Sequence, residues 1–335
     1  MLTKQALPGY TGFTEIMTNM GTLRNYGFEM EVRANILNNP KGLTWDVTAN
    51  LSSVANKIVK LPYNGNENNR VGGYEVATGR KKADGTPETK WIAGRQEGGK
   101  LGELVAYKQN HIFKDWDDVK KYANNRIDEV ANLYGPGLAA QYAGKEGWQP
   151  IEPGDVCWED INGDGVINGY DRQVVGNIFP KITGGFSTTL GYKNLSLYAR
   201  FDYALGHTIY NDLAARSLGQ YQGSFNIIKE VKKTWSETNT DTDLPAFYYA
   251  DQLSKKNITR SNNGNTAIDN NSSRFYEKGD YLALRELTLN YNLPKAWISK
   301  VGMTDASVYV TGQNLFYITG YTGVSPEPAV DTTYG

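Results

Sequence analysis

The sequence predicts an all-β fold in which long antiparallel hairpins form part of a transmembrane β-barrel. Apolar and polar residues alternate with period two over three pairs of segments, short turns join the members of each pair, and long polar segments separate the pairs. A strand of about twelve residues, rising about 3.3 Å per residue and tilted near 40°, covers roughly 30 Å, the apolar thickness of a bilayer. A soluble β-sandwich, whose strands also alternate but run about 5 to 6 residues, is the alternative.

The first predicted hairpin has arms at residues 25–36 and 43–52, joined by the turn-forming stretch "NNPKG". Its apolar rows are Tyr26, Phe28, Met30, Val32, Ala34 and Ile36 on the first arm and Leu43, Trp45, Val47, Ala49 and Leu51 on the second. The first arm carries Glu29, Glu31 and Arg33 between its apolar residues. In a barrel the apolar rows would contact lipid and the polar rows would line the lumen.

Two further hairpins follow the same pattern. The second, at residues 182–203, turns at Lys193 and Asn194, and the third pairs residues 281–293 with 306–317 across "PKAWISKVGMTD", which we expect to hold one short helix. The segments between hairpins, at about 59–181 and 204–275, are long and rich in Gly, Asn, Asp and Tyr. Because short turns at one end and long loops at the other are typical of outer-membrane barrels, we expect both segments to be extracellular loops.

Two segments inside these loops are predicted to be helical. Residues 116–124 follow Asp115, a suitable N-cap, and residues 226–237 repeat apolar side chains every four positions at Ile227, Val231 and Trp235. We expect both helices to pack on the other loop residues.

Composition narrows the class of function. The net charge of −1 argues against nucleic acid as a partner, and the chain lacks the run of about 18 apolar residues that predicts a membrane helix. The single Cys157 excludes an internal disulfide and is expected to be a small buried residue, while His111 and His207 lie far apart in the sequence. Without a nucleophilic triad, zinc motif, phosphate loop or dinucleotide fingerprint, the sequence predicts that the protein is not an enzyme.

The stretch "DINGDGVINGYD", residues 160–171, has the spacing of an EF-hand-type calcium loop. The predicted metal ligands are the side chains of Asp160, Asn162, Asp164 and Asp171 and the backbone carbonyl of Val166. Gly165 permits the sharp turn, because glycine adopts a left-handed backbone at little cost. The alternative is that this cluster of Asp, Asn and Gly only forms turns.

Helices are not expected on either side of this loop, unlike in an EF-hand. Pro153 and Gly154 precede it, and Gly176 and Pro180 leave room for little more than one helical turn after it. All the ligands come from one short segment without an acid–base partner. The expected cofactor is therefore a structural Ca²⁺ in an extracellular loop, with a Kd of about 10⁻⁴ to 10⁻³ M.

Three blocks of sequence are distinctive. They are "LPGYTGF" with "NMGTLRNYGFEMEV", then "GDVCWEDINGDGVINGYDRQVVGNIFPKITGGFSTTLGYKNLSLYARFDYALGHTIYN", and last "YLALRELTLNYNLP" with "VYVTGQNLFYITGYTGVSPE". Together these blocks span nearly the whole chain and resemble the C-terminal third of the SusC/RagA-type TonB-dependent outer-membrane transporters of Bacteroidetes. Ala283, where that family usually has Arg, and Ser325, where it usually has Asp, depart from the pattern.

The resemblance implies a multi-pass barrel of 22 strands in the cell outer membrane. Residues 1–335 would form the C-terminal portion of this single barrel domain, with the plug domain and the closing strand absent. It also implies TonB-dependent import of a nutrient, either an oligosaccharide or, as the alternative cargo, a peptide. The partners would be a SusD-like surface lipoprotein that forms a lid, TonB through the missing N-terminal part, and outer-membrane lipid.

The residues that bind the cargo are left unassigned by the sequence. Aromatic residues of the loops could stack on sugar rings or pack within their own loops; they are Trp91, Trp148, Tyr221, Tyr248 and Tyr249. A secreted calcium-dependent glycan-binding β module is a competing function. It would explain the metal loop and the 23 tyrosines but not hairpins of bilayer length separated by such unequal loops.

Overall fold

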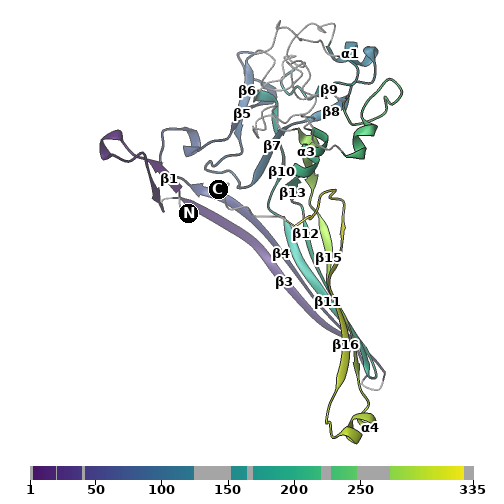
Figure 1. Ribbon diagram of the computed structural model, residues 1–335. Helices are drawn as coiled ribbons and strands as arrows, with labels where there is room; N and C mark the ends of the chain where they lie inside the picture. Colours follow the sequence, from purple (N-terminus) through teal and green to yellow (C-terminus); the bar gives the residue numbers. More distant parts are fainter. Residues whose placement is uncertain are drawn as a thin grey trace. The chain divides into compact units, whose positions relative to one another are not determined.

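The structure, a computed structural model, describes residues 3–19, 21–39, 42–123, 152–163, 169–219, 228–246 and 272–327. The chain divides into two compact units, whose elements are labelled in Figure 1. The sheet unit comprises Asn25–Asn56, Ile178–Ile209 and Lys278–Gly335, and the loop unit comprises Met1–Arg24, Lys57–Asn177 and Tyr210–Glu277. Both predicted long loops fall largely within the loop unit, and their extracellular orientation stays a prediction. In the described residues there is no helix with the length and apolar character to cross a membrane.

Six strands form one antiparallel sheet, in the order β16-β15-β12-β11-β4-β3 (Figure 1). The strands are β3 (Thr22–Asn38), β4 (Leu43–Lys60), β11 (Ile182–Tyr192), β12 (Leu195–Leu205), β15 (Tyr281–Asn292) and β16 (Ser307–Thr319). The three predicted hairpins are confirmed. The arms of the first are longer than predicted, since β3 has 17 residues and β4 has 18.

One face of this sheet is apolar and exposed. Two of its cross-strand rows are Leu43, Tyr192, Leu195, Tyr291 and Val308, and Trp45, Leu190, Leu197, Leu289 and Val310. Side chains that a water-soluble protein would bury are open here: Met30 is 52% exposed, Val32 is 50% exposed and Val310 is 72% exposed. Continuous exposed apolar rows are the arrangement that lipid contact requires.

The opposite face of the sheet is polar and hydrogen-bonded. Asn35 Nδ2 donates to Asp46 Oδ1 at 2.6 Å, and Ser52 Oγ donates to Glu29 Oε1 at 3.4 Å. These contacts link β3 to β4 through side chains on the face that the sequence assigned to polar residues. The predicted division of the first hairpin into an apolar and a polar side is therefore confirmed.

The loop unit contains short two-stranded ladders that the sequence did not predict. They pair β1 (Thr3–Ala6) with β2 (Glu15–Thr18), β5 (Tyr74–Lys81) with β6 (Pro87–Ile92), β7 (Glu103–Tyr107) with β10 (Arg172–Asn177), and β8 (Gln109–Ile112) with β9 (Val156–Trp158). A local signal existed for β5 and β6, because Asp84-Gly85 between two alternating stretches favours a hairpin turn, and Gly85 has φ 83°. Buried residues of these ladders form two small cores; one holds Tyr107, Ile112, Val156 and Trp158, and the other holds Val76, Ile92 and Val105.

The remaining described elements are short. One further ladder pairs β13 (Thr208–Tyr210) with β14 (Tyr276–Lys278). The 3-10 helices are η1 (Gly9–Thr11), η2 (Glu67–Asn69), η4 (Gly169–Asp171), η5 (Lys229–Lys233), η7 (Ser273–Phe275) and η8 (Ser299–Val301). The α-helices are α1 (Trp116–Ala123), α3 (Asp212–Gly219) and α4 (Lys295–Ile298).

Two of the predicted helices are confirmed. Helix α1 begins after Asp115, whose Oδ1 accepts the backbone N–H of Asp118 at 2.8 Å and so acts as the predicted N-cap. Asn124, at its predicted end, lies outside the described residues. Helix α4 continues into η8, and this short helical segment ends at Gly302, whose φ of 76° is the left-handed conformation that glycine favours.

The predicted helix at 226–237 is wrong over its described part, where the structure has only the 3-10 helix η5. Its C-terminal carbonyls bind side chains instead of the next helical turn. Asn239 Nδ2 donates to the carbonyls of Lys233 and Thr234, and Thr242 Oγ1 donates to Lys233 as well. The N–H of Trp235 then donates to the carbonyl of Leu244, which directs the chain away from a helix. Ile227 lies outside the described residues.

Helix α3 was not predicted. Its local signal is the N-cap Asn211, whose Oδ1 accepts the backbone N–H of Ala214 at 3.0 Å.

Candidate functional site

The predicted metal loop follows β9 and ends in η4. Asp171 is fully buried, and its Oδ1 accepts the backbone N–H of Ile161 at 3.0 Å. Asp160 Oδ1 accepts the backbone N–H of Gly163 at 2.8 Å. The first and last predicted ligands thus both bind backbone N–H groups of the first turn, so the structure brings the two ends of the loop together.

Of the other predicted ligands, Asn162 lies in this first turn, and Asp164 and Val166 lie outside the described residues. The described residues contain no group of three or more His, Cys, Asp or Glu side chains that could hold a metal ion. The donor chemistry fits Ca²⁺, because the carboxylates at both ends of the loop are hard oxygen ligands. Calcium binding by this loop stays a prediction.

The loop is seated on the ladder of β5 and β6. Gly79, in β5, has φ 76°, and a Cβ added there would lie 3.3 Å from the carbonyl oxygen of Ile161. Directly after the loop, the Arg172 guanidinium lies 4.6 Å from the ring centroid of Tyr74 and 5.4 Å from that of Tyr107. Cation–π contacts of this kind hold the end of the loop against β5 and β7. Cys157, just before the loop, is buried as predicted.

Among the aromatic residues considered for sugar stacking, only Trp91 lies in the described part of the chain. Its ring is covered by the guanidinium of Arg70, whose central carbon is 3.7 Å from the ring centroid. That face of Trp91 therefore packs within its own loop. The other four, Trp148, Tyr221, Tyr248 and Tyr249, lie outside the described residues.

A second candidate site lies on the polar face of the sheet, where β15 carries a bulge. Opposite β12, the consecutive residues Arg200 and Phe201 pair with Glu286 and Leu284, so Arg285 is an extra residue. Opposite β16, Arg285 faces two residues, Asn314 and Leu315, so β16 also bulges here. A β-bulge re-aims a side chain. Arg285 and Glu286 consequently both project from the polar face, while Leu284 keeps its place among the apolar rows.

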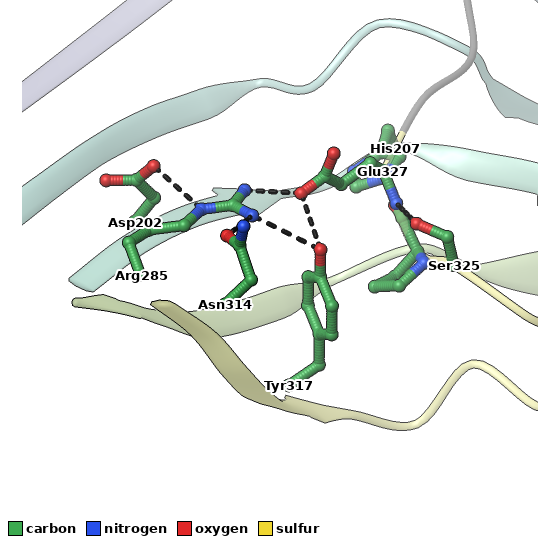
Figure 2. A network of polar contacts seen from close by, with 8 residues as sticks. Asp202, His207, Arg285, Asn314, Tyr317, Ser325 and Glu327 are labelled. Atoms are coloured by element: carbon green, nitrogen blue, oxygen red, sulfur yellow. Dashed lines mark hydrogen bonds and ion pairs between the residues drawn. The ribbon is translucent and has the colours of Figure 1, made fainter. Parts of the chain in front are cut away.

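Arg285, in β15, is the centre of a polar network that also includes residues of β12, of β16 and of the segment after β16 (Figure 2). Its Nε donates to Asp202 Oδ2 at 3.0 Å, and its Nη1 donates to Asn314 Oδ1 at 3.3 Å and to the Tyr317 hydroxyl at 3.2 Å. Its Nη2 donates to Glu327 Oε1, which also accepts the Tyr317 hydroxyl at 2.7 Å. Two carboxylates from separate segments therefore share one guanidinium.

Glu327 belongs to residues 320–327, which follow β16 and which we call the strap. The strap has a second attachment to the sheet, since His207 Nε2 lies 3.0 Å from the carbonyl oxygen of Pro326. His207 is 1% exposed, and a Cβ added at Gly279 would lie 2.2 Å from its Nε2, so only glycine leaves room for the imidazole. The Glu327 backbone N–H donates to Ser325 Oγ at 3.3 Å.

The network changes the acidity of Glu327. Hydrogen bonds from Tyr317 and Arg285 hold the pKa of its carboxyl below the ordinary value of 4.5. Both donors stabilise the ionised form, which is consequently the form that the strap presents to the sheet at neutral pH.

Sequence reasoning did not find this network, although a signal for the bulge was present. In "YLALRELTLNYN" the apolar residues stand at even positions through Leu284 and at odd positions from Leu287 onward. Such a change of parity indicates an extra residue in the strand. The partners Asp202 and Glu327 are distant in sequence, so only the tertiary structure identifies them.

Known proteins with similar sequences or structures are TonB-dependent receptors and a transporter. No family model matches the chain. TonB-dependent receptor P3 of Formosa agariphila is 28% identical over 327 residues, which is 98% of this chain and 27% of the relative. TonB-dependent receptor SusC of Bacteroides thetaiotaomicron is 25% identical over 98% of this chain and 26% of its own length. The solved structure of the RagAB peptide transporter matches with a TM-score of 0.62 and 21% identity, over 98% of this chain and 29% of that one.

The sheet has one exposed apolar face, and with these relatives the chain is similar to part of a TonB-dependent receptor of the outer membrane. Within that class the similarity is to the SusC/RagA type, as the sequence blocks indicated. The chain spans 27% of the length of the first of these relatives. The relatives are receptors and transporters, in agreement with the prediction that the protein is not an enzyme.

Proposed function

We propose that the protein imports a nutrient across the outer membrane with energy delivered through TonB. The observation that carries this proposal is the six-stranded sheet, with an exposed apolar face for lipid and a hydrogen-bonded polar face for a lumen. The similarity to TonB-dependent receptors over 98% of the chain supports it. In the complete receptor these strands would belong to a barrel of 22, a size at which the lumen is plugged rather than packed with side chains.

The proposed cargo is an oligosaccharide, and the second candidate is a peptide. The polar, aromatic-rich sequence of the loops supports the first, while the structural similarity to the RagAB peptide transporter supports the second. A secreted calcium-dependent glycan-binding module is disfavoured, because its relatives would not be receptors of the outer membrane. Uptake by cells carrying or lacking the gene, with labelled oligosaccharides and labelled peptides as separate substrates, tests the proposal. Uptake of neither substrate class, or uptake that persists when TonB is deleted, would contradict it.

The proposed partner is a SusD-like surface lipoprotein that closes over extracellular loops at about 59–181 and 204–275. These loops are too long and polar for periplasmic turns. Tyr63 is 83% exposed, and nothing lies within 4 Å of a Cβ added at the neighbouring Gly65, which makes this turn suitable for an inserted epitope. An antibody should label the epitope on intact cells, and the lipoprotein should protect it. Labelling only after permeabilisation would mean that the loops face the periplasm.

The proposed cofactor is one structural Ca²⁺ in the loop at 160–171. The hydrogen bonds of Asp160 and Asp171 to the first turn support the proposal, because they hold the carboxylates from both ends of the loop at the same turn. The ion would hold the loop against β5 and would not take part in chemistry.

A further inference from the structure

The contacts around Arg285 form a carboxylate site that the chain itself occupies. Guanidinium groups and tyrosine hydroxyls are strong donors to carboxylates, and here both donate to the same oxygen of Glu327 (Figure 2). We propose that Arg285 and Tyr317 bind a carboxylate of the cargo, and that Glu327 fills this site from within the chain until the cargo displaces it. The inference rests on the proposed import function, and it adds the class of cargo group that the sheet recognises.

Release of Glu327 would not leave Arg285 without partners. The guanidinium would keep its ion pair with Asp202 at 3.0 Å and its hydrogen bonds to Asn314 and Tyr317. Breaking an ion pair is costly chiefly when it leaves an unpaired charge in a poorly solvated place. Since Asp202 remains, displacement of the Glu327 carboxylate breaks only its contacts with Arg285 and Tyr317, and the strap can stay attached through Pro326 and His207.

The carboxylate of Glu327 is also accessible. Its side chain is 41% exposed, whereas that of Arg285 is 16% exposed. An incoming ligand can therefore reach the occupying carboxylate before it reaches the guanidinium. Val324, within the strap, is 88% exposed, so the middle of the strap is open to solvent.

The site lies on the face of the sheet that would line the path of the cargo. Asp202, Arg285 and Tyr317 project from the polar face, opposite the lipid-facing rows that contain Phe201, Leu284 and Phe316. A cargo carboxylate could come from an acidic sugar or from a peptide, which present the same group to Arg285. The sources are distinguished by experiment.

The test measures hydrogen exchange of residues 320–327 in the complete transporter, purified in detergent, with millimolar probes. The acidic probes are an oligogalacturonate and a Glu-containing peptide, and the neutral probes are an oligosaccharide and a peptide of matching lengths. We expect at least one acidic probe to raise the exchange rate of the strap about threefold to tenfold, and the neutral probes to leave it unchanged. The acidic probe that acts identifies the source of the carboxylate.

Three variants test the roles of the residues. Glu327→Gln should raise the exchange rate of the strap about tenfold without any probe, because the ion pair with Arg285 is lost and Tyr317 then donates to a neutral acceptor. Tyr317→Phe keeps the ring and should weaken the response to the acidic probe at least threefold. Glu286→Gln is the matched control, since Glu286 lies in the same bulge but accepts from Thr288 Oγ1 at 3.0 Å, and it should behave as the wild type.

The proposal is overturned if neither acidic probe changes the exchange rate of the wild-type strap, or if Glu286→Gln opens the strap as much as Glu327→Gln does. Either result would make the strap a fixed structural brace. Because exchange is measured without TonB, these outcomes are independent of the uptake experiment. Failure of uptake for every substrate would refute the import function instead.

Discussion

The indole Nε1 of Trp45 donates a hydrogen bond to Thr188 Oγ1 at 2.9 Å, from β4 to β11 on the apolar face of the sheet. Both residues stand in apolar rows that would face lipid in the proposed barrel, where water would not satisfy a polar group. The bond pairs two groups that would otherwise each be exposed to hydrocarbon, and it links neighbouring strands through side chains.

Replacing Thr188 by Val should lower the stability of the complete barrel by about 1 to 2 kcal/mol, because the indole N–H loses its acceptor. Unfolding by urea in lipid vesicles measures the effect. Thr189→Val is the matched control, since the neighbouring side chain points to the polar face. A larger loss in Thr189→Val than in Thr188→Val would show that the two faces are assigned the wrong way round.

Charge substitutions should distinguish the two faces of the first hairpin. Val32 is 50% exposed on the apolar face, so Val32→Arg places a charge in hydrocarbon at a cost of about 2 to 4 kcal/mol when the residue lies near the bilayer midplane. Glu31→Arg, one residue away, places it on the polar face and should be tolerated. The readout is the fraction of receptor recovered folded from outer membranes. Equal recovery of both variants would contradict the assignment of lipid and lumen.

Calcium should protect the predicted metal loop. We expect millimolar Ca²⁺ to slow hydrogen exchange across residues 155–180, with half of the effect at about 10⁻⁴ to 10⁻³ M. Asp160→Ala should abolish this protection while the barrel stays folded. Glu159→Gln is the control, since the adjacent Glu159 carboxylate pairs with Lys108 at 3.0 Å and not with the loop. Protection that is insensitive to Asp160→Ala would refute the site.

The attachment of the strap to the sheet should weaken only as the pH falls below the ordinary pKa of Glu327. The Glu327 pKa is lowered from 4.5 in the closed strap, so the ionised carboxylate contributes fully above that value and the contribution is lost as pH falls through the lowered pKa. Exchange of residues 320–327, corrected for its intrinsic pH dependence, should be constant from neutral pH to about 4.5 and rise only in more acidic buffer. In Glu327→Gln the rise should disappear. A rise already between pH 7 and 5 would implicate a different group.

The alternating sequence was sufficient to predict the long hairpins and the faces of their strands, because a period of two assigns each side chain to a side once one face is apolar. It was also sufficient for the Asp115 N-cap and for the burial of Cys157, both of which depend on local chemistry. The alternation did not predict the short ladders of the loop unit. Pairs such as β8 with β9 depend on contacts between distant segments, whereas the β5–β6 hairpin has a local signal in Asp84-Gly85.

The helix predicted at residues 226–237 is wrong for the same physical reason, because contacts with residues further along the chain decide the structure there. The fourfold apolar repeat is a local preference, and it loses to Asn239 and Thr242, whose side chains bind the carbonyls that a helix would have used. The Arg285 network likewise needed the tertiary structure. The parity change in β15 marks a bulge, but the partners of Arg285 come from β12, from β16 and from the strap. The sequence by itself therefore determined the strands and their two faces, because the alternation of apolar and polar residues is a local property of each strand. Only the fold decided which charges meet, because it brings together Asp202, Arg285 and Glu327 from separate segments.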